Sequence, residues 1–162
     1  MKMEIIKVGM ADLQIGRHPC MITTLGLGSC VGISLFDRAT KVCGMAHVML
    51  PSSKQARDNK NIAKFADTGI IDLLNQMLRI GAKRASIIAK LAGGAQMFAF
   101  REVSDVMRIG DRNVDASREV LGLLKIPILA EDVGLNYGRT IELYSADGTV
   151  HIKTIGHGSK TS

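Results

Sequence analysis

A thiol and an imidazole close to a glycine-rich turn are the side chains of this sequence best suited to covalent chemistry. The segment TTLGLGSC, residues 23–30, ends in Cys30, and His47 follows seventeen residues later in GMAHVMLP. An imidazole beside a free thiol can withdraw its proton, and the thiolate then attacks an acyl carbon. Backbone amides of a tight turn can stabilise the resulting oxyanion. The pattern indicates a nucleophile at Cys30, with Gly28 and Ser29 in the oxyanion-binding turn.

Two further cysteines are candidates for the same role. Cys20 has only His18 near it, and that proximity is one of sequence alone. Cys43 lies four residues from His47, which on a strand is about 13 Å. The same separation argues against a zinc site on Cys43 and His47, for which a third and a fourth ligand are also missing. We therefore interpret Cys20 and Cys43 as structural residues.

The glycines of the turn also resemble parts of phosphate-binding and hydrolase motifs. Gly26 and Gly28 begin a G-x-G, but position 31, where a dinucleotide fingerprint has its third glycine, is Val31. A serine hydrolase using Ser29 would need G-x-S-x-G, and GSCVG is one residue short in front. These alternatives are weak, and the sequence predicts neither a cofactor nor a metal.

A β-hairpin formed by CVGISLF and KVCGMAHVML would bring the thiol and the imidazole together. If its loop is centred between Arg38 and Ala39, Cys30 lies directly opposite His47. Directly opposed residues have Cβ atoms about 5 Å apart, which is close enough for a hydrogen bond between the side chains. The hairpin register therefore predicts a Cys30–His47 pair.

The two faces of this hairpin support the pairing. One face would be apolar and would contact the main core, with Val31, Ile33 and Leu35 among its residues. The other would be smaller and more polar and would carry Cys30 and His47. Thr24, just before the turn, could hydrogen-bond the imidazole and fix its orientation. A lone cysteine or histidine is more often structural, so it is the joint placement that favours catalysis.

Hydrophobic periodicity predicts an α/β protein with many short strands. We expect strands near residues 3–9, 11–16, 20–26, 30–36, 41–50, 85–92, 128–134, 138–144 and 149–155, and helices near 62–80 and 113–125. The first two strands alternate only partly, as edge strands do. We interpret residues 1–156 as a single domain and the polar tail 157–162 as disordered.

The composition is that of a soluble globular protein, with 46% hydrophobic and 22% charged residues. Apolar runs are shorter than the ~20 residues of a membrane span, no signal-peptide pattern is present, and three scattered cysteines favour a reducing, cytoplasmic compartment. The net charge is +6, but aromatic residues are only 4% and Lys and Arg form no long run. These features favour a solvated basic surface over a nucleic-acid site, and an acidic protein partner fits the charge equally well.

Six segments resemble the bacterial chemotaxis CheD family: TLGLGSCVGISLFD, GMAHVMLP, KFADTGI, AKLAGGAQMF, RIGDRNV and AEDVGLNYGRTIEL. The matching blocks run from about residue 10 to residue 155. This resemblance implies a chemoreceptor glutamine deamidase, which hydrolyses glutamine side chains on receptor cytoplasmic helices to glutamate and releases ammonia. It assigns the catalytic cysteine, histidine and threonine to Cys30, His47 and Thr24. The hairpin register selects the same three residues.

The resemblance also implies a layered, mixed β-structure flanked by helices, related to deamidating bacterial toxins. It implies a second partner, the phosphatase CheC, which competes with receptors for binding to CheD. Met97, Phe98 and Phe100 are candidate apolar anchors for a partner, although the sequence alone slightly favours a role in filling the core. A basic deamidase would be steered toward receptor helices rich in glutamate. A non-catalytic module that docks on CheC or on receptors stays open as the alternative.

Overall fold

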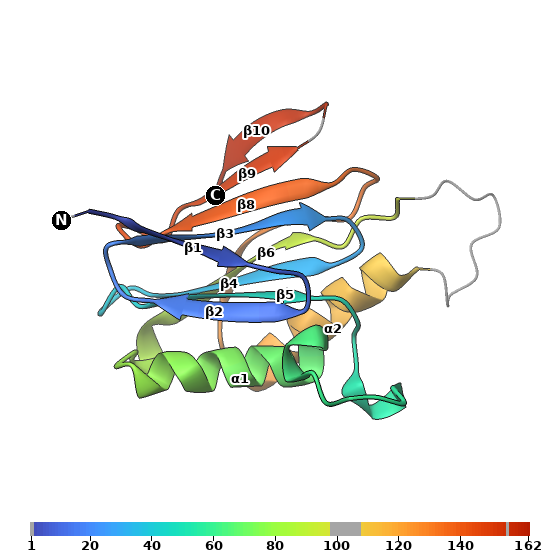
Figure 1. Cartoon of the computed structure of the whole chain (residues 1–162), viewed down its shortest axis with the longest axis horizontal. Coiled ribbons are helices and arrows are strands. Elements are labelled where there is room, and N and C mark those ends of the chain that lie inside the picture. Colours follow the sequence, from blue (N-terminus) through green and yellow to red (C-terminus); the bar gives the residue numbers. More distant parts are fainter. Residues whose placement is uncertain (1, 98–107, 155) are drawn as a thin grey trace.

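In the part of the chain that the structure describes, two five-stranded β-sheets pack face to face, and two α-helices cover the outer face of one of them (Figure 1). The structure is a computed structural model and describes residues 2–97, 108–154 and 156–162. The order of layers is therefore sheet, sheet, helices. The predicted α/β class with layered, mixed sheets is confirmed, with both helices on the same side.

The first sheet contains the N-terminal and C-terminal strands. Its order is β1 (Glu4–Val8), β3 (Cys20–Leu27), β8 (Arg139–Tyr144), β9 (Val150–Thr154) and β10 (Gly158–Thr161). β1 runs parallel to β3, and the other neighbours are antiparallel. β1 forms an edge, as its short, partly alternating sequence predicted.

The second sheet lies between the first sheet and the helices. Its order is β2 (Asp12–Gly16), β5 (Cys43–Val48), β4 (Val31–Asp37), β6 (Ile87–Gly93) and β7 (Ile128–Val133), with only β6 and β7 parallel. Every residue of β4 and β5 is buried, because both faces of these central strands are covered. β2 is the second predicted edge strand.

The helices pack on the second sheet through apolar stripes. α1 (Ala66–Arg79) buries Ile70, Leu73 and Met77, and it approaches β5 where Gly44 has no side chain. A Cβ atom there would lie 2.7 Å from the sulfur of Met77. α1 begins four residues later than predicted because Phe65 is extended and residues 62–64 form a 3-10 turn. α2 (Ile109–Leu123) begins four residues earlier than predicted.

Short 3-10 helices precede and follow α1, at Ser53–Gln55, Ile62–Lys64 and Arg84–Ser86. Within residues 2–97, 108–154 and 156–162, none of the helices has the length and apolar character needed to cross a membrane.

Two separate apolar cores follow from this layering. One fills the space between the second sheet and the helices and includes Val31, Ile33 and Leu35 of β4. The other lies between the sheets and includes Cys30 and Met45. Alternation along β4 and β5 sends successive side chains into the two cores. The predicted division of these residues between two faces is therefore confirmed, but the face of Cys30, which was expected to be smaller and more polar, lies in a second apolar core.

The C-terminal segment differs from the expectation of a disordered tail over residues 157–162. Gly158–Thr161 forms β10, which pairs with β9 in an antiparallel register from Gly158 opposite Thr154 to Thr161 opposite His151. The Thr154 hydroxyl also donates to the Gly158 carbonyl, at 2.8 Å. The prediction was wrong because the segment is polar and fully exposed, so its sequence carries no apolar signal, whereas backbone pairing needs none.

Candidate active site

The hairpin that carries the predicted nucleophile and base has a different register from the expected one. His47 lies opposite Gly32, and Val31 lies opposite Val48. The prediction of Cys30 directly opposite His47 is therefore wrong by two residues. A shift of two keeps every side chain on its face. Cys30, the residue before β4, and His47 consequently lie on the face between the sheets at diagonal positions, for which the typical spacing is about 7–8 Å.

The turn of the hairpin explains the shift. The loop covers residues 38–41 and is closed by the Asp37 N–H donating to the Val42 carbonyl, at 2.9 Å. The Asp37 carboxylate accepts from the Ala39 N–H at 2.8 Å and from the Thr40 hydroxyl at 2.6 Å. Burial acts to raise the pKa of Asp37, but hydrogen bonds from Ser86, Thr40, Lys83 and Ala39 together lower it to about 2. Asp37 thus ends the strand, and the loop is centred between Ala39 and Thr40 instead of between Arg38 and Ala39. Moving the centre by one residue shifts the cross-strand register by two.

Thr24 and His47 form a buried hydrogen-bonded pair. The Thr24 hydroxyl oxygen lies 2.7 Å from Nδ1 of His47 and 2.8 Å from the carbonyl oxygen of Val8. Thr24 and His47 are each only 1% exposed. Three strands, β1, β3 and β5, therefore supply one group each to a continuous hydrogen-bond chain.

The direction of this chain fixes the tautomer of the neutral imidazole. The Val8 carbonyl can only accept, so the single hydroxyl proton of Thr24 is donated to Val8. The hydroxyl oxygen must then accept from Nδ1, which carries the ring proton. Nε2 of His47 is left with its lone pair, and it is buried without a hydrogen-bond partner among the described residues. That nitrogen is available as a base.

Burial keeps both the imidazole and the thiol neutral. It lowers the pKa of His47 below the ordinary value of 6.5, because the imidazolium would be poorly solvated. It raises the pKa of Cys30, an effect that the backbone amide of Cys30 partly opposes. At neutral pH the site therefore holds a thiol and an unprotonated imidazole.

The turn before Cys30 is held by contacts with distant segments. Gly26 adopts φ = 68°, and its carbonyl accepts from the Gly28 N–H at 3.0 Å. The Gly28 carbonyl accepts from the Ala95 N–H at 2.8 Å, and the Ser29 carbonyl accepts from the side-chain amide of Asn113 at 2.9 Å. Because carbonyl and N–H point in opposite directions across a trans peptide, these contacts aim the N–H groups of Ser29 and Cys30 to the other side.

The amides of Ser29 and Cys30 are therefore the available donors of the turn. Neither donates to a backbone carbonyl among the described residues, although the Cys30 N–H contacts its own thiol, whereas the Gly28 N–H already donates to Gly26. Two adjacent amides that point to the same side can stabilise a developing oxyanion. The N–H of Gly28, a residue predicted for the oxyanion-binding turn, is occupied by its hydrogen bond to Gly26.

The other two cysteines lie at a distance from this turn. Cys20 on β3 and Cys43 on β5 are 1% and 0% exposed and contact each other between the sheets. The hydrogen bond with Cys43 lowers the pKa of Cys20 to about 7, and Cys43 is raised in pKa by the same contact and by burial. Cys43 and His47 share strand β5, four residues apart, as expected.

The candidate partner residues are described only in part. Met97 is 47% exposed, and its side chain borders the turn, 3.3 Å from where a Cβ of Gly28 would lie. It is therefore a rim residue and not a core residue. Phe98 and Phe100 lie outside the described residues. Within the described chain, no group of three or more His, Cys, Asp or Glu side chains is close enough to hold a metal ion.

Sequence reasoning missed two residues that contact this region, Asn113 and Arg139. Asn113 is fully buried on the face of α2 that also carries Val114 and Ser117. Arg139 is 1% exposed and shares the buried, inward face of β8 with Ile141. A polar or charged residue at a core position of an amphipathic pattern was the available signal in each case.

A buried thiol, an unprotonated imidazole and a hydroxyl that orients it form a group typical of cysteine hydrolases. The family model described as CheD chemotactic sensory transduction matches residues 49–154, and curated relatives cover nearly the whole chain. This chain therefore belongs to the CheD family.

Three relatives illustrate the similarity. Proteins named probable chemoreceptor glutamine deamidase CheD, from Lachnoclostridium phytofermentans and Caldanaerobacter subterraneus subsp. tengcongensis, are each 57% identical to this chain, covering 97% and 99% of it and 98% and 99% of themselves. The chemoreceptor glutamine deamidase CheD of Halalkalibacterium halodurans is 52% identical over 97% of this chain and 98% of its own. The crystal structure of a Neisseria meningitidis protein has a TM-score of 0.50 at 10% identity, covering 82% of this chain and 64% of that one, and shows the fold alone.

Selective alkylation is the first test of the site. With limiting iodoacetamide we expect Cys30 to react before Cys20 and Cys43, because Cys30 is 8% exposed and shares its face with an imidazole. Peptide mapping of the partly labelled protein would give the order of reaction. Equal labelling of all three thiols would contradict an accessible, assisted Cys30.

Proposed function

We propose that this protein hydrolyses glutamine side chains on the cytoplasmic helices of chemoreceptors to glutamate. The observation that carries the proposal is the chain from Val8 through Thr24 to His47, which leaves Nε2 unprotonated on the face that carries Cys30. The relatives named chemoreceptor glutamine deamidase supply the substrate class. A reaction on cytoplasmic helices takes place in the cytoplasm, the compartment expected from the cysteine content.

In the acylation step, Nε2 of His47 takes the proton of the Cys30 thiol, and the sulfur attacks the carboxamide carbon of glutamine. The carbonyl oxygen gains negative charge and is bound by the N–H groups of Ser29 and Cys30. The imidazolium returns its proton to the departing nitrogen, so ammonia leaves and a thioester remains on Cys30.

In the deacylation step, the same imidazole takes a proton from water, and the hydroxide attacks the thioester carbon. The bond from carbon to sulfur breaks, and the proton returns to Cys30. The glutamate side chain is released, and its carboxylic acid proton passes through water to ammonia, so amide and water have been converted to carboxylate and ammonium. His47 therefore acts as base and acid in turn, which requires that its protonated form be only transient, as the lowered pKa favours.

The surroundings of the turn suit a helical, glutamate-rich substrate. The chain carries a formal charge of +6, which attracts acidic surfaces, and Met97 offers an exposed apolar contact beside Gly28. We propose that Met97 borders the bound receptor helix. Phe98 and Phe100 lie outside the described residues and stay candidate anchors from the sequence alone.

The direct test is incubation of the purified protein with a receptor cytoplasmic fragment that contains glutamine. Intact mass and peptide sequencing would show conversion of particular glutamines to glutamate, and a coupled assay would show ammonia in equal amount. A receptor fragment in which those glutamines are already glutamate is the control. A receptor fragment unchanged in mass after prolonged incubation would refute the proposal.

A module that acts only by docking, on a receptor or on the phosphatase CheC implied by the family resemblance, is the alternative. Nothing about docking alone requires an oriented imidazole, and this is what favours catalysis. CheC binding stays a prediction, and a pull-down with purified CheC would test it separately from deamidation.

Replacement of Thr24 by valine should isolate the orienting role of its hydroxyl. Valine keeps the shape but cannot accept from Nδ1, so the neutral imidazole loses its tautomer preference and Val8 loses a donor. We expect kcat to fall by about 10- to 100-fold with little change in KM. Thr24→Ser keeps the hydroxyl and should retain most of the activity. Equal losses in both variants would show that the hydroxyl is not the important feature.

A further inference from the structure

The peptide of Cys30 rests on a glycine pair at the end of β6. The Gly94 N–H donates to the Cys30 carbonyl at 2.8 Å, one residue before the contact of Ala95 with the Gly28 carbonyl. Gly93 adopts φ = 107°, and a Cβ atom there would collide with the Cys30 carbonyl oxygen. The position of the nucleophile therefore depends on where the backbone of residues 93–95 lies.

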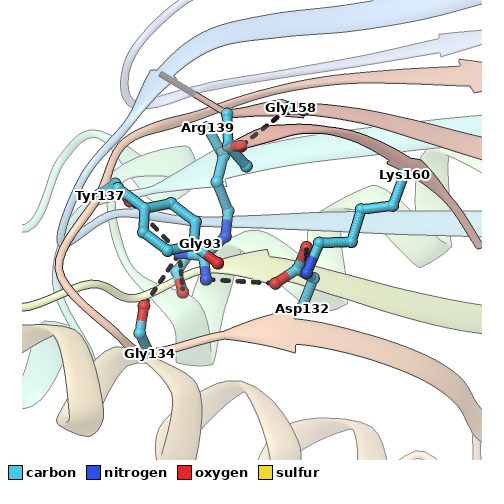
Figure 2. A network of polar contacts seen from close by, with 8 residues as sticks. Gly93, Asp132, Gly134, Tyr137, Arg139, Gly158 and Lys160 are labelled. Atoms are coloured by element: carbon cyan, nitrogen blue, oxygen red, sulfur yellow. Dashed lines mark hydrogen bonds and ion pairs between the residues drawn. The ribbon is translucent and has the colours of Figure 1, made fainter. Parts of the chain in front are cut away.

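A buried guanidinium holds this backbone from the opposite side. Nη1 of Arg139 lies 3.4 Å from the Gly93 carbonyl oxygen and 3.0 Å from the Gly134 carbonyl oxygen. The Gly134 N–H also donates to the Gly93 carbonyl, at 3.0 Å. Arg139 thus connects the end of β6 to the loop between β7 and β8, as Figure 2 shows.

The position of the Arg139 guanidinium is fixed by its charged and aromatic neighbours. Nη2 forms an ion pair with Asp132 at 3.2 Å, and the ring of Tyr137 lies 4.6 Å from the guanidinium carbon. Asp132 also pairs with Lys160 of β10, at 3.2 Å (Figure 2). A buried cation is costly unless its hydrogen bonds and counter-ion are in place, so this set of contacts permits only a narrow range of guanidinium positions.

We propose that Arg139 is a positioning residue for the nucleophile, acting through the Gly93–Gly94 backbone on the peptide of Cys30. The inference rests on the proposed function, in which Cys30 attacks the substrate. Arg139 does not touch the reacting atoms. Its planar fork spans two carbonyls and one carboxylate at once, which the single ammonium of lysine cannot reproduce.

The test compares Arg139→Lys with Arg118→Lys. Arg118 also pairs with a carboxylate of β7, Glu131, at 2.7 and 3.1 Å, but it has no hydrogen bond to the turn that carries Cys30. In Arg139→Lys we expect kcat to fall about 10-fold or more with KM nearly unchanged, since small displacements of a reacting group are that costly. Arg118→Lys should keep wild-type kinetics.

The rate of Cys30 alkylation is measured in parallel and needs no receptor. We expect a fall of about fivefold or more in Arg139→Lys, at temperatures well below its unfolding transition, and no fall in Arg118→Lys. If the wild type failed to deamidate receptors, the proposed function would be wrong, yet the alkylation rates would still decide the positioning role.

An Arg139→Lys protein that is folded and reacts at the wild-type rate would overturn the inference, as would equal losses in both lysine variants. If Arg139→Lys does not fold, Asp132→Asn replaces it. Asparagine keeps the shape and one acceptor but removes the counter-ion charge. A reduced Cys30 alkylation rate in that variant would support the inference, and an unchanged rate would overturn it.

Discussion

Replacement of Cys30 by alanine is expected to abolish receptor deamidation, with a loss of at least about 10³-fold that reaches the detection limit. The reason is that no other thiol can take its place. Cys20 and Cys43 are both buried between the sheets, and Cys43 is four residues along β5 from His47. The measurement is glutamine loss from a receptor fragment, followed by intact mass.

Cys20→Ala is the matched control for this variant. It also removes a buried sulfur from the core between the sheets, so it carries a comparable packing cost. We expect it to keep kcat near the wild-type value. Glutamine loss that continues unchanged in Cys30→Ala would eliminate the thioester mechanism, and inactive Cys20→Ala would show that core packing, not the nucleophile, accounts for the loss.

Replacement of His47 by glutamine is expected to lower kcat/KM by about 10²- to 10⁴-fold, the usual contribution of a general acid–base group. Glutamine can still donate to Thr24, but it has no lone pair of suitable basicity to accept the thiol proton. His151→Gln, on the exposed side of β9 near Glu142, is the control and should be fully active. A His47→Gln enzyme within about tenfold of wild type would remove His47 from the proton-transfer role.

The pH dependence provides a second measure of His47. Its folded-state pKa lies below 6.5, so the wild-type enzyme should show a constant kcat/KM above that pH and an acid limb with its midpoint below it. The free energy of unfolding should also fall as the pH is lowered. Below pH 6.5 the unfolded chain binds a proton that the folded chain resists, so His47 lowers stability as the pH falls. His47→Gln should reduce this slope in denaturant unfolding curves measured between pH 7 and 5.

Much of the fold was predictable because local patterns agree with the tertiary structure. The alternation in residues 30–36 and 41–50 divided the hairpin into its two faces, and that division is the one that the two cores show. The register was not predictable in the same way. Asp37 accepts hydrogen bonds from its own turn and from Lys83 and Ser86, and contacts with residues so far along the chain leave no periodic signal.

The structure of the tail over residues 157–162 could not be predicted from the sequence either. Its residues are polar and exposed, so burial could not predict a strand there. Pairing with β9 depends on backbone groups, which every sequence possesses, and Lys160 then reaches Asp132 through its length alone.

By itself the sequence determined which residue types are present at which spacing: the thiol after a glycine turn, the histidine on the following strand, and Thr24 before the turn. These three residues can be selected from side-chain chemistry and strand alternation, which are local properties of the sequence. Only the tertiary structure decided that Thr24 donates to Val8 and so leaves Nε2 of His47 unprotonated. It also decided which distant groups hold the turn, since Asn113 and Arg139 act on carbonyls more than 40 residues away in sequence. Such hydrogen bonds have direction only in three dimensions, and it is their direction that leaves Nε2 of His47 able to accept a proton on the face that carries Cys30.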